Sequence, residues 1–528
     1  MSFPRVLNWM PATLLSICAG VALYCAAPPL NWWPLAFLGV ACLWLVSSGG
    51  LFTRFCLGTL AGFVYFYLLC DWAALAARTE LARLALALSQ GVFFGVLLIA
   101  WTYSHRGYKD FLARKPLAGI FLVATTDSVL WVLVEQCRGM VPFGGMPWGS
   151  LGYSLVDSPL VNLSPWGSIQ LVDFVAVFCA VLAANVICAL RARAVFSAIT
   201  ALTVPLVVLI LPSFIGNAVP GSASVRIGVV QGNVPDESKL GPGESRALIV
   251  TQHHAQATRK ILSQRPDIIL WPESASDRDI RQDPEAKNIV DTLMKDSGGV
   301  PIMLGTQKYV GDTRTNDYVA INGDGVVGTY SKQHPVPFGE YLPFRTTIER
   351  IVPEAKKISV DMVPGNSAAQ LKVRAGKTDI VAAVPICFEV AYSRIVAQGA
   401  LGANLLVVPT NNASFGRSGE PLQQLAMTRF RAIEHGKSAI QVSTSGTSAV
   451  ISARGVVRYQ TDLFEQSATV IDVPLISTQT VATRTAELLE YLCFALGVLC
   501  LLMPTYLLLR QAKLSRSTQS QPKSKRKS

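Results

Sequence analysis

Eight apolar stretches constrain this chain more than any other feature of its sequence. A helix needs about 20 consecutive apolar residues to cross the hydrocarbon core of a bilayer. Stretches of about that length lie at residues 9–28, 31–48, 51–71, 84–104, 116–136, 168–190, 194–215 and 486–509. Charged residues make up only 15% of the 528 residues, whereas about a quarter is typical of a soluble domain. The sequence therefore predicts an eight-helix transmembrane bundle and excludes a wholly soluble protein.

The first apolar stretch has two interpretations. Because Arg5 precedes an apolar run that small residues follow, the stretch is compatible with a cleaved signal peptide. Six further apolar stretches come before the large polar region, and no A-x-A cleavage site stands before Pro28. These features favour an uncleaved first helix.

The positions of the basic residues predict how the chain is oriented in the membrane. Lysine and arginine cluster in the loop at 104–115, at 191–193 and in the tail after residue 510, and the net charge is +12. Because loops rich in lysine and arginine stay on the cytoplasmic side, the large polar region is expected to face outward. We expect a plasma (inner) membrane protein whose tail binds anionic lipid rather than nucleic acid.

Four regions are expected along the chain. A seven-helix transmembrane region (1–216) precedes an extracytoplasmic domain (217–484), an eighth transmembrane helix (485–510) and a basic cytoplasmic tail (511–528). Within 217–484, apolar strand-like runs alternate with helix-like ones, a pattern typical of layered α/β domains. Expected strands lie at 224–233, 267–274, 300–310, 378–389 and 404–415, hairpins at 317–332 and 437–455, and helices at 245–264, 283–296, 392–400 and 421–436.

The stretch at 340–365 mixes apolar and basic residues and lacks clear strand character. It has two interpretations. It is either a loop that dips toward the lipid headgroups and gates a site, or an ordinary surface loop.

Three polar residues end apolar strand-like runs in the outward domain. Glu273 closes DIILWPE, Lys332 closes VVGTYSK and Cys387 closes IVAAVPIC. Domains of the α/β class place their reactive groups at strand ends. A thiolate is a nucleophile, a carboxylate can take the thiol proton, and an ammonium favours the thiolate and can face an oxyanion. The three residues together predict a covalent acyl-transfer site.

Each of these residues also has a structural interpretation when taken alone. A buried cysteine in a strand is usually inert core, and a glutamate before a serine often starts a helix or a turn. Cys387 nevertheless differs from the other ten cysteines, which lie inside or at the edge of the apolar stretches. His334 or His435 would be the base of a Cys–His hydrolase, but Glu273 has the better context. Since HExxH and paired CxxC motifs are missing from the sequence, it indicates no zinc site.

Three sequence motifs surround these residues: WPES (271–274), YSKQHPVPFGEYLPF (330–344) and PICFE (385–389). They resemble the Glu-Lys-Cys triad signatures of the nitrilase superfamily. With seven apolar stretches before them and one after, the chain resembles the apolipoprotein N-acyltransferase family, the membrane-embedded branch of that superfamily. The resemblance implies an α/β fold: a nitrilase-like αββα sandwich inserted before the last helix of an eight-helix transmembrane bundle.

The resemblance also implies a role for each site residue. Glu273 would be the general base, Lys332 the stabiliser of the thiolate and the oxyanion, and Cys387 the acyl-accepting nucleophile. The K-x7-E spacing of Lys332 and Glu340 and the C-x-E spacing of Cys387 and Glu389 both match the family. These two glutamates would support the triad.

Some positions outside the triad bear on the substrate contacts. Asn316, in TRTNDY, matches a family asparagine near the site. Leu240 stands where the family often has tryptophan, and Phe388 replaces a frequent tyrosine. Phe415 lies in TNNASFG, which replaces an Asn-Asp-Ala-Trp pattern. These departures put the aromatic contacts to substrate in question, whereas the triad is intact.

The implied reaction moves a fatty acyl chain from a phospholipid to the N-terminal amine of a diacylated apolipoprotein, with no cofactor and no metal. Lifting a sixteen-carbon chain into water would cost about 12 kcal/mol, at about 0.8 kcal/mol per CH₂. A site against the outer leaflet removes most of that cost. Two alternatives stay open: a membrane-tethered amidase, in which water resolves the thioester, and a transporter or receptor with an inactive nitrilase fold.

Overall fold

The computed structural model describes residues 9–46, 49–191, 195–215, 221, 223–235, 245–351, 355–356 and 358–519. Leu240, one of the predicted departures from the family pattern, lies outside these residues. Most of the boundary between the first two expected regions (216–220 and 222) and the end of the basic tail (520–528) also lie outside them.

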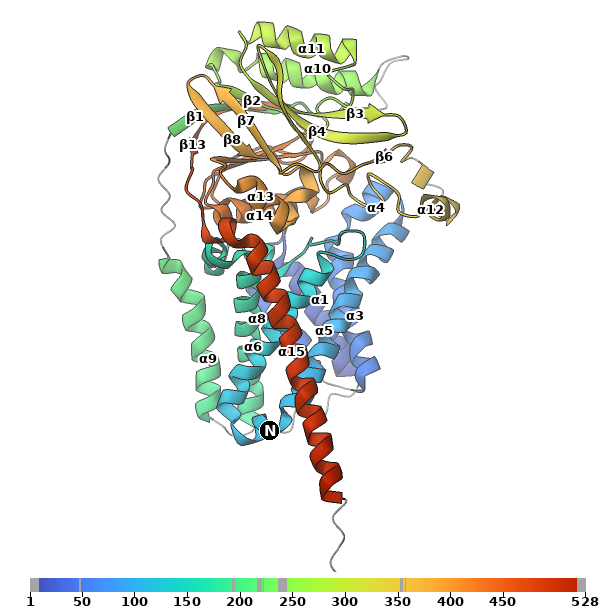
Figure 1. Ribbon diagram of the computed structural model, residues 1–528, viewed down its shortest axis with the longest axis vertical. Helices are drawn as coiled ribbons and strands as arrows, with labels where there is room; N and C mark the ends of the chain where they lie inside the picture. Colours follow the sequence, from blue (N-terminus) through green and yellow to red (C-terminus); the bar gives the residue numbers. More distant parts are fainter. Residues whose placement is uncertain are drawn as a thin grey trace, which may run out of the picture.

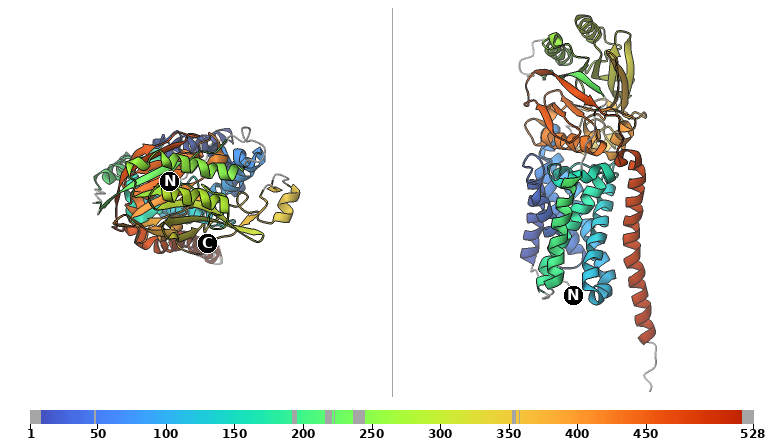
Figure 2. Two further views of the ribbon diagram at one scale, coloured as in Figure 1. Left: turned by 90° about the horizontal axis from the view of Figure 1, so that it is seen from above. Right: turned by 90° about the vertical axis from the view of Figure 1, so that its left-hand side faces the viewer.

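A bundle of long helices forms one end of the molecule, and a layered α/β domain rests on the bundle (Figure 1). The last helix, α15, leaves the α/β domain and runs back along the side of the bundle (Figure 2). The bundle contains α1 (Trp9–Ala26), α2 (Pro34–Leu45), α3 (Leu51–Leu69), α4 (Trp72–Ala77), α5 (Glu80–Arg114), α6 (Pro116–Arg138), α7 (Leu151–Ser154), η1 (Pro159–Leu163), α8 (Ser164–Arg191), α9 (Val195–Ile210), η2 (Leu211–Phe214) and α15 (Val481–Gln519).

Each predicted apolar stretch contains a helix. Within the described residues, five helical segments are long and apolar enough to cross a membrane: 51–69, 80–114, 116–138, 159–186 and 481–511. Three shorter apolar helices lie at 10–26, 34–45 and 199–214, and the total of eight spans stays a prediction. In the apolar window of α15 only 11% of the residues are buried within the protein. Exposed apolar surface of this extent marks a contact with a membrane or a partner.

Glycines allow two of these helices, α3 and α5, to approach each other closely. A Cβ on Gly58 would lie 2.5 Å from the carbonyl oxygen of Phe94, and a Cβ on Gly62 would lie 2.8 Å from the Cα of Gly91. Small residues four positions apart are typical of helix pairs that pack within membranes. The two helices therefore form one closely packed wall of the bundle.

The α/β domain contains two mixed sheets. Its strands are β1 (Ala223–Gln231), β2 (Ile268–Leu270), β3 (Ile302–Val310), β4 (Thr313–Asn322), β5 (Gly325–Ser331), β6 (Asp361–Met362), β7 (Gln370–Ala375), β8 (Thr378–Ala383), β9 (Leu405–Thr410), β10 (Ala439–Ser443), β11 (Ala449–Ile451), β12 (Val457–Gln460) and β13 (Ser467–Leu475). The first sheet has the order β13-β1-β2-β3-β4-β5, with β6 beside β4, and the second has the order β12-β11-β10-β9-β8-β7. In each sheet the three central strands are parallel, and the strands that flank them are antiparallel to them.

Apolar side chains hold the two sheets face to face. Ile227 and Leu270 of the first sheet share one core with Ile380 and Val407 of the second. The domain's helices are α10 (Arg246–Arg259), η4 (Leu262–Gln264), α11 (Pro284–Asp296), α12 (Arg345–Ile351), η6 (Cys387–Ala391), α13 (Ser393–Ala400), η7 (Ala413–Phe415) and α14 (Glu420–His435).

Two pairs of these helices cover the sheets. The pair α10 and α11 packs on the outer face of the first sheet, and the pair α13 and α14 lies between the second sheet and the bundle (Figure 1). The result is the predicted αββα sandwich, with one helical layer resting on the bundle.

The ends of the strands correct three sequence predictions: the expected strands 267–274, 378–389 and 404–415 all extend too far, the last because β9 ends at Thr410 and η7 follows it. β2 ends at Leu270 and β8 ends at Ala383, so neither Glu273 nor Cys387 closes a strand. Apolar side chains continue beyond both strands into the turns that follow, which is why the sequence pattern extends too far. The stretch 340–365 contains α12 and β6, and β7, β12 and β13 are strands that the sequence analysis does not predict.

Candidate active site

The Glu273 carboxylate lies in the turn that follows β2. Gly305 of the adjacent β3 makes room for this turn, because a Cβ there would lie 2.6 Å from the Cα of Glu273. Asn316 Nδ2 lies 2.6 Å and Lys332 Nζ lies 3.3 Å from Glu273 Oε1. The backbone N–H of Asn411 donates to Oε2 at 2.8 Å. The carboxylate is buried, and donors from three separate elements fix its position.

Lys332 directly follows β5, as predicted, and its side chain is buried between two carboxylates. Nζ lies 2.7 Å from Glu340 Oε1 and 3.3 Å from Glu273 Oε1. The second oxygen of Glu340 accepts from the backbone N–H of Val336 at 2.7 Å. Burial alone would lower the pKa of Lys332, but the charges of Glu273 and Glu340 outweigh it and raise the pKa well above its ordinary value. The ammonium is therefore permanent at neutral pH.

Cys387 begins the short turn η6 (Cys387–Ala391), called the thiol turn below. Its φ of 54° lies in the left-handed region, which residues other than glycine rarely adopt. Such a conformation costs on the order of 1–3 kcal/mol and persists only when the surrounding structure holds it. The thiol is buried, with the residue 7% exposed, and it interacts electrostatically with both Glu273 and Lys332.

The environment of the thiol keeps it protonated at rest. Burial raises the pKa of Cys387 far above its ordinary value, and the charge of Glu273 raises it further. Lys332 and a hydrogen bond with Thr410 act in the opposite direction. Because only the thiolate is a strong nucleophile, a base must take the proton as Cys387 attacks. Burial also raises the pKa of Glu273, against the opposing charge of Lys332, and a raised pKa makes this carboxylate a better proton acceptor.

Glu389 is buried and organises the backbone around the thiol turn. Its Oε1 accepts from the backbone N–H groups of Gln333 at 2.6 Å and His334 at 3.0 Å. Its Oε2 accepts from the backbone N–H of Ile386 and the hydroxyl of Tyr330, both at 2.8 Å. These four donors tie the loop after β5 to the start of the thiol turn.

The structure brings together all the side chains predicted as site residues. Asn316, Glu273, Lys332 and Glu340 are joined by hydrogen bonds and ion pairs. The Cys387 thiol interacts with the charges of Glu273 and Lys332, and Glu389 holds the thiol turn. The catalytic roles of these residues stay predictions.

Three further polar residues lie at the site without having been predicted. β9 ends at Thr410, whose side chain lowers the pKa of the thiol, and the backbone N–H of Asn411, the next residue, donates to Glu273. Glu420, at the start of α14, interacts electrostatically with the thiol, and burial raises its pKa to about 8. Thr410 and Asn411 could have been predicted as site residues, because they lie at the end of a strand. Glu420 could not, because a glutamate at the start of a helix does not indicate an active site.

Phe388 and Phe415, two of the predicted departures, belong to an aromatic cluster beside the thiol turn. Phe388 stacks on Trp148, with ring centroids 4.6 Å apart. Trp72 packs edge-on against Phe388 at 6.4 Å and against Phe415 at 5.5 Å. Since Trp72 and Trp148 come from the bundle, the bundle and the α/β domain together form the apolar wall next to Cys387.

Both histidines considered as alternative bases have other partners. His334 Nε2 lies 3.2 Å from the carbonyl oxygen of Gly144, and the ring stacks on Tyr392. His435 Nδ1 lies 2.9 Å from Thr483 Oγ1, and burial lowers the pKa of His435 to about 4. In the described ranges, no group of three or more His, Cys, Asp or Glu side chains is arranged to hold a metal ion.

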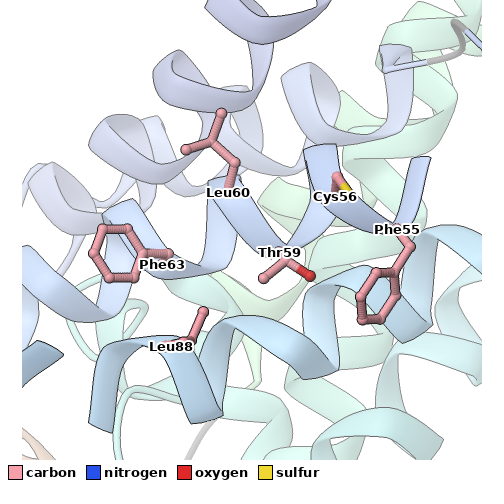
Figure 3. Close-up of a pocket in the computed structure, with 6 residues that line it drawn as sticks. All are labelled: Phe55, Cys56, Thr59, Leu60, Phe63 and Leu88. Carbon is pink, nitrogen blue, oxygen red and sulfur yellow. The ribbon is translucent and has the colours of Figure 1, made fainter. Parts of the chain in front are cut away.

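A separate hollow lies in the bundle, on the wall formed by α3 and α5 (Figure 3). Its volume is about 380 Å³, and its lining residues are Phe55, Cys56, Thr59, Leu60, Phe63 and Leu88. The lining is apolar apart from one thiol and one hydroxyl. No carboxylate, ammonium or imidazole is among the described residues that line this hollow, so the candidate active site is the Glu273 cluster.

The αββα sandwich defines the class of protein. Residues 227–483 match the family described as carbon-nitrogen hydrolase. Residues 19–182, in the bundle, match the family described as the apolipoprotein N-acyltransferase N-terminal domain. The chain thus joins a carbon-nitrogen hydrolase domain to a helical region known from one particular family.

Similar proteins cover almost the whole chain. An apolipoprotein N-acyltransferase of Azotobacter vinelandii is 29% identical over 488 residues, which cover 87% of this chain and 88% of the relative. One of Pseudomonas paraeruginosa is 30% identical over 484 residues, which cover 86% and 88%. One of Geobacter metallireducens is 26% identical over 501 residues, which cover 91% and 93%. The chain belongs to the apolipoprotein N-acyltransferase family.

Proposed function

We propose that this protein transfers a fatty acyl chain from a phospholipid, through a thioester on Cys387, to the N-terminal amine of the diacylglyceryl-cysteine of apolipoproteins. The observation that carries the proposal is the Lys332 ammonium, which lies 3.3 Å from Glu273 and 2.7 Å from Glu340 and interacts with the Cys387 thiol. This cluster lies in a domain that rests on apolar helices, so an acid, a cation and a thiol meet where a lipid substrate is available.

The first half-reaction forms the thioester. Glu273 takes the proton of the Cys387 thiol as its sulfur attacks the ester carbonyl of the phospholipid. The negative charge that develops on the carbonyl oxygen faces the Lys332 ammonium, which needs no rearrangement to stabilise it. The lysophospholipid then leaves with the proton that Glu273 returns.

The second half-reaction forms the amide. The acceptor amine attacks the thioester carbon, Glu273 takes the amine proton, and Glu273 returns that proton to the Cys387 sulfur as the carbon–sulfur bond breaks. A buried base is suited to this step, because an N-terminal amine with an ordinary pKa near 8 must lose a proton to form an amide. Glu340, Glu389 and Asn316 support the cluster by holding Lys332, the thiol turn and Glu273 respectively.

The α/β domain faces the outer leaflet, and the chain crosses the plasma membrane eight times. α4, just before α5, contacts Phe415 of the α/β domain through Trp72, so α5 starts beside that domain and its basic end lies at the far end of the bundle. α15 also runs from the α/β domain to the far end (Figure 1). Both basic segments therefore lie opposite the α/β domain, and the far end is cytoplasmic by the positive-inside rule.

The segment 340–365, of which residues 352–354 and 357 lie outside the described residues, gates the site from the lipid side. Phe344 is 74% exposed and Ile351 is 66% exposed. The rings of Phe338 and Phe344 lie 5.8 and 5.9 Å from Phe143, in the bundle loop between α6 and α7. Exposed apolar side chains beside the bundle support contact with lipid and favour a gate over an ordinary surface loop.

Product analysis tests this proposal. The purified protein is incubated with a phospholipid and a synthetic diacylated lipopeptide, and the products are separated by mass spectrometry. We expect N-acylated lipopeptide and lysophospholipid in equal amounts, and neither with a Cys387→Ala variant. Free fatty acid without N-acylated product would identify an amidase, and undiminished product from Cys387→Ala would contradict the thioester route.

A further inference from the structure

A buried ion pair on α14 lies where the α/β domain meets the bundle. Arg431 Nη1 donates a hydrogen bond to Glu434 Oε2, and the two side chains are 0% and 1% exposed. Removing a charged pair from water is costly unless both partners make further hydrogen bonds. The further partners of this pair are therefore informative about what it holds in place.

Most of the partners of Arg431 belong to the segment that follows the nucleophile. Its Nε donates to the carbonyl oxygen of Val390 at 2.9 Å, and its Nη2 donates to the carbonyl oxygen of Ala391 at 2.9 Å. Nη2 also lies 3.1 Å from the hydroxyl of Ser393, at the start of α13. The planar guanidinium thus fixes two successive carbonyl groups at the end of the thiol turn, which a single point charge cannot do with the same geometry.

The thiol turn needs such a restraint. Cys387 has a left-handed φ of 54°, a conformation that persists only when the structure on both sides imposes it. Before Cys387, the backbone N–H of Ile386 is held by Glu389. After Cys387, the guanidinium of Arg431 holds the carbonyl groups. The strained residue is therefore clamped at both ends.

The same ion pair reaches into the bundle. Glu434 Oε1 accepts a hydrogen bond from the hydroxyl of Ser168. Ser168 has a φ of 57° and, with Gly167, interrupts α8. The hydroxyl of Tyr153, in α7, lies 2.6 Å from Arg431 Nη2 and donates to the carbonyl oxygen of Ala391 at 2.8 Å. Two bundle elements therefore contact the clamp directly.

We propose that Arg431 is a positioning residue for the nucleophile, and that Glu434 and Ser168 tie it to α8, so that the seating of the α/β domain on the bundle sets the position of the Cys387 thiol. The inference rests on the proposed function, in which Cys387 accepts the acyl chain. It assigns no chemistry to Arg431, which acts only through the thiol turn.

The test compares Arg431→Gln with Lys437→Gln in the full-length protein in phospholipid nanodiscs. Lys437 is a matched control because it is also buried, and its Nζ holds the carbonyl oxygens of Ile476 and Thr478 instead of the thiol turn. One readout is the single-turnover rate of acylation of Cys387, followed by intact mass across phospholipid concentrations. The other is hydrogen exchange of the peptide that spans 385–393.

We expect Arg431→Gln to lower the saturating acylation rate by about 100-fold, because a misplacement of about 1 Å costs about that much. The half-saturating phospholipid concentration should not change, since lipid binding is untouched. Exchange at 385–393 should rise. Arg431→Lys should be intermediate, and Lys437→Gln should leave both readouts at wild-type values. Equal acylation rates for the folded fractions of Arg431→Gln and Lys437→Gln would overturn the inference.

Ser168→Ala keeps the ion pair and is the variant that decides the matter if Arg431→Gln does not fold. We expect the acylation rate to fall by about 2- to 30-fold, which corresponds to the usual coupling energies between linked sites, together with faster exchange at 385–393. Wild-type values for both readouts would contradict the claim that the contact with α8 sets the position of the thiol. If the wild-type protein itself gains no acyl group, the proposed function fails, whereas the exchange data still decide whether the clamp exists.

Discussion

The two sheets of the α/β domain follow one plan and contribute different groups to the site. In each, three parallel strands lead into antiparallel ones: β1, β2 and β3 into β4 and β5, and β8, β9 and β10 into β11 and β12. The turn after β2 carries Glu273, and the turn after the equivalent β9 carries Asn411, whose N–H donates to Glu273 at 2.8 Å. The first half supplies Glu273 and Lys332, and the second supplies the thiol and this N–H donor.

The helices that cover the two sheets differ more than the strands do. α11 buries one face only, formed by Ala286, Val290, Leu293 and Met294. In α14 every residue except Leu422 and Arg429 is buried. A helix buried on all sides needs a partner on each face, and α14 packs against both the second sheet and the bundle. The comparison teaches that the half which carries the nucleophile is also the half fixed to the bundle.

Removing the base contributed by the first half should have the largest effect. Glu273→Gln keeps the shape of the side chain but cannot take the thiol proton, so the acylation rate of Cys387 should fall by about 10²- to 10⁴-fold. The rate is followed by intact mass after mixing with phospholipid. Glu285→Gln, an exposed glutamate of α11, serves as the control and should leave the rate unchanged. Equal rates in the two variants would show that Glu273 is not the base.

The difference between α14 and α11 should appear as a difference in stability. Phe430 of α14 is fully buried, and Phe430→Ala should lower the free energy of unfolding by about 3–5 kcal/mol. Thr292 lies on the exposed face of α11, and Thr292→Ala should change it by no more than about 0.5 kcal/mol. Denaturant unfolding in detergent measures both. Similar losses in the two variants would refute the assignment of α14 as the helix between sheet and bundle.

The neighbours of Glu273 should shift the acid limb of the pH–rate profile in opposite directions. Burial raises the pKa of Glu273, Glu340 raises it further, and Asn316 lowers it. The base must be ionised, so activity is lost as the pH falls through this pKa. Asn316→Ala removes a group that lowers the pKa and should move the acid limb to higher pH. Glu340→Gln removes a charge that raises it and should move the limb to lower pH. Shifts of the same sign in kcat/KM would exclude Glu273 as the titrating base.

Much of the architecture follows from the sequence, because long apolar runs and alternating strand-like and helix-like patterns report burial directly. Each predicted apolar stretch contains a helix, and Lys332 follows its strand as expected. The hydrogen bond from Ser168, at the interruption of α8, to Glu434 carries no such signal, because its two residues are distant in the chain.

The site residues are predictable because their motifs are specific, whereas their geometry is not. The apolar run before Cys387 predicts a continuous strand, yet the strand ends at Ala383 and the cysteine adopts a left-handed conformation. That conformation is imposed by Glu389 and Arg431. Contacts with distant residues therefore determine the backbone conformation of Cys387, which the local sequence pattern predicts wrongly as part of a strand.

The central claim is that the thiol of Cys387 carries the acyl chain between donor and acceptor. Intact-mass measurement after incubation with phospholipid alone, without an acceptor, tests it most directly. The wild-type protein should gain the mass of one acyl chain, located on Cys387 by fragmentation, and Cys387→Ala should gain none. An unmodified wild-type protein, or an equal adduct on the alanine variant, would contradict the account.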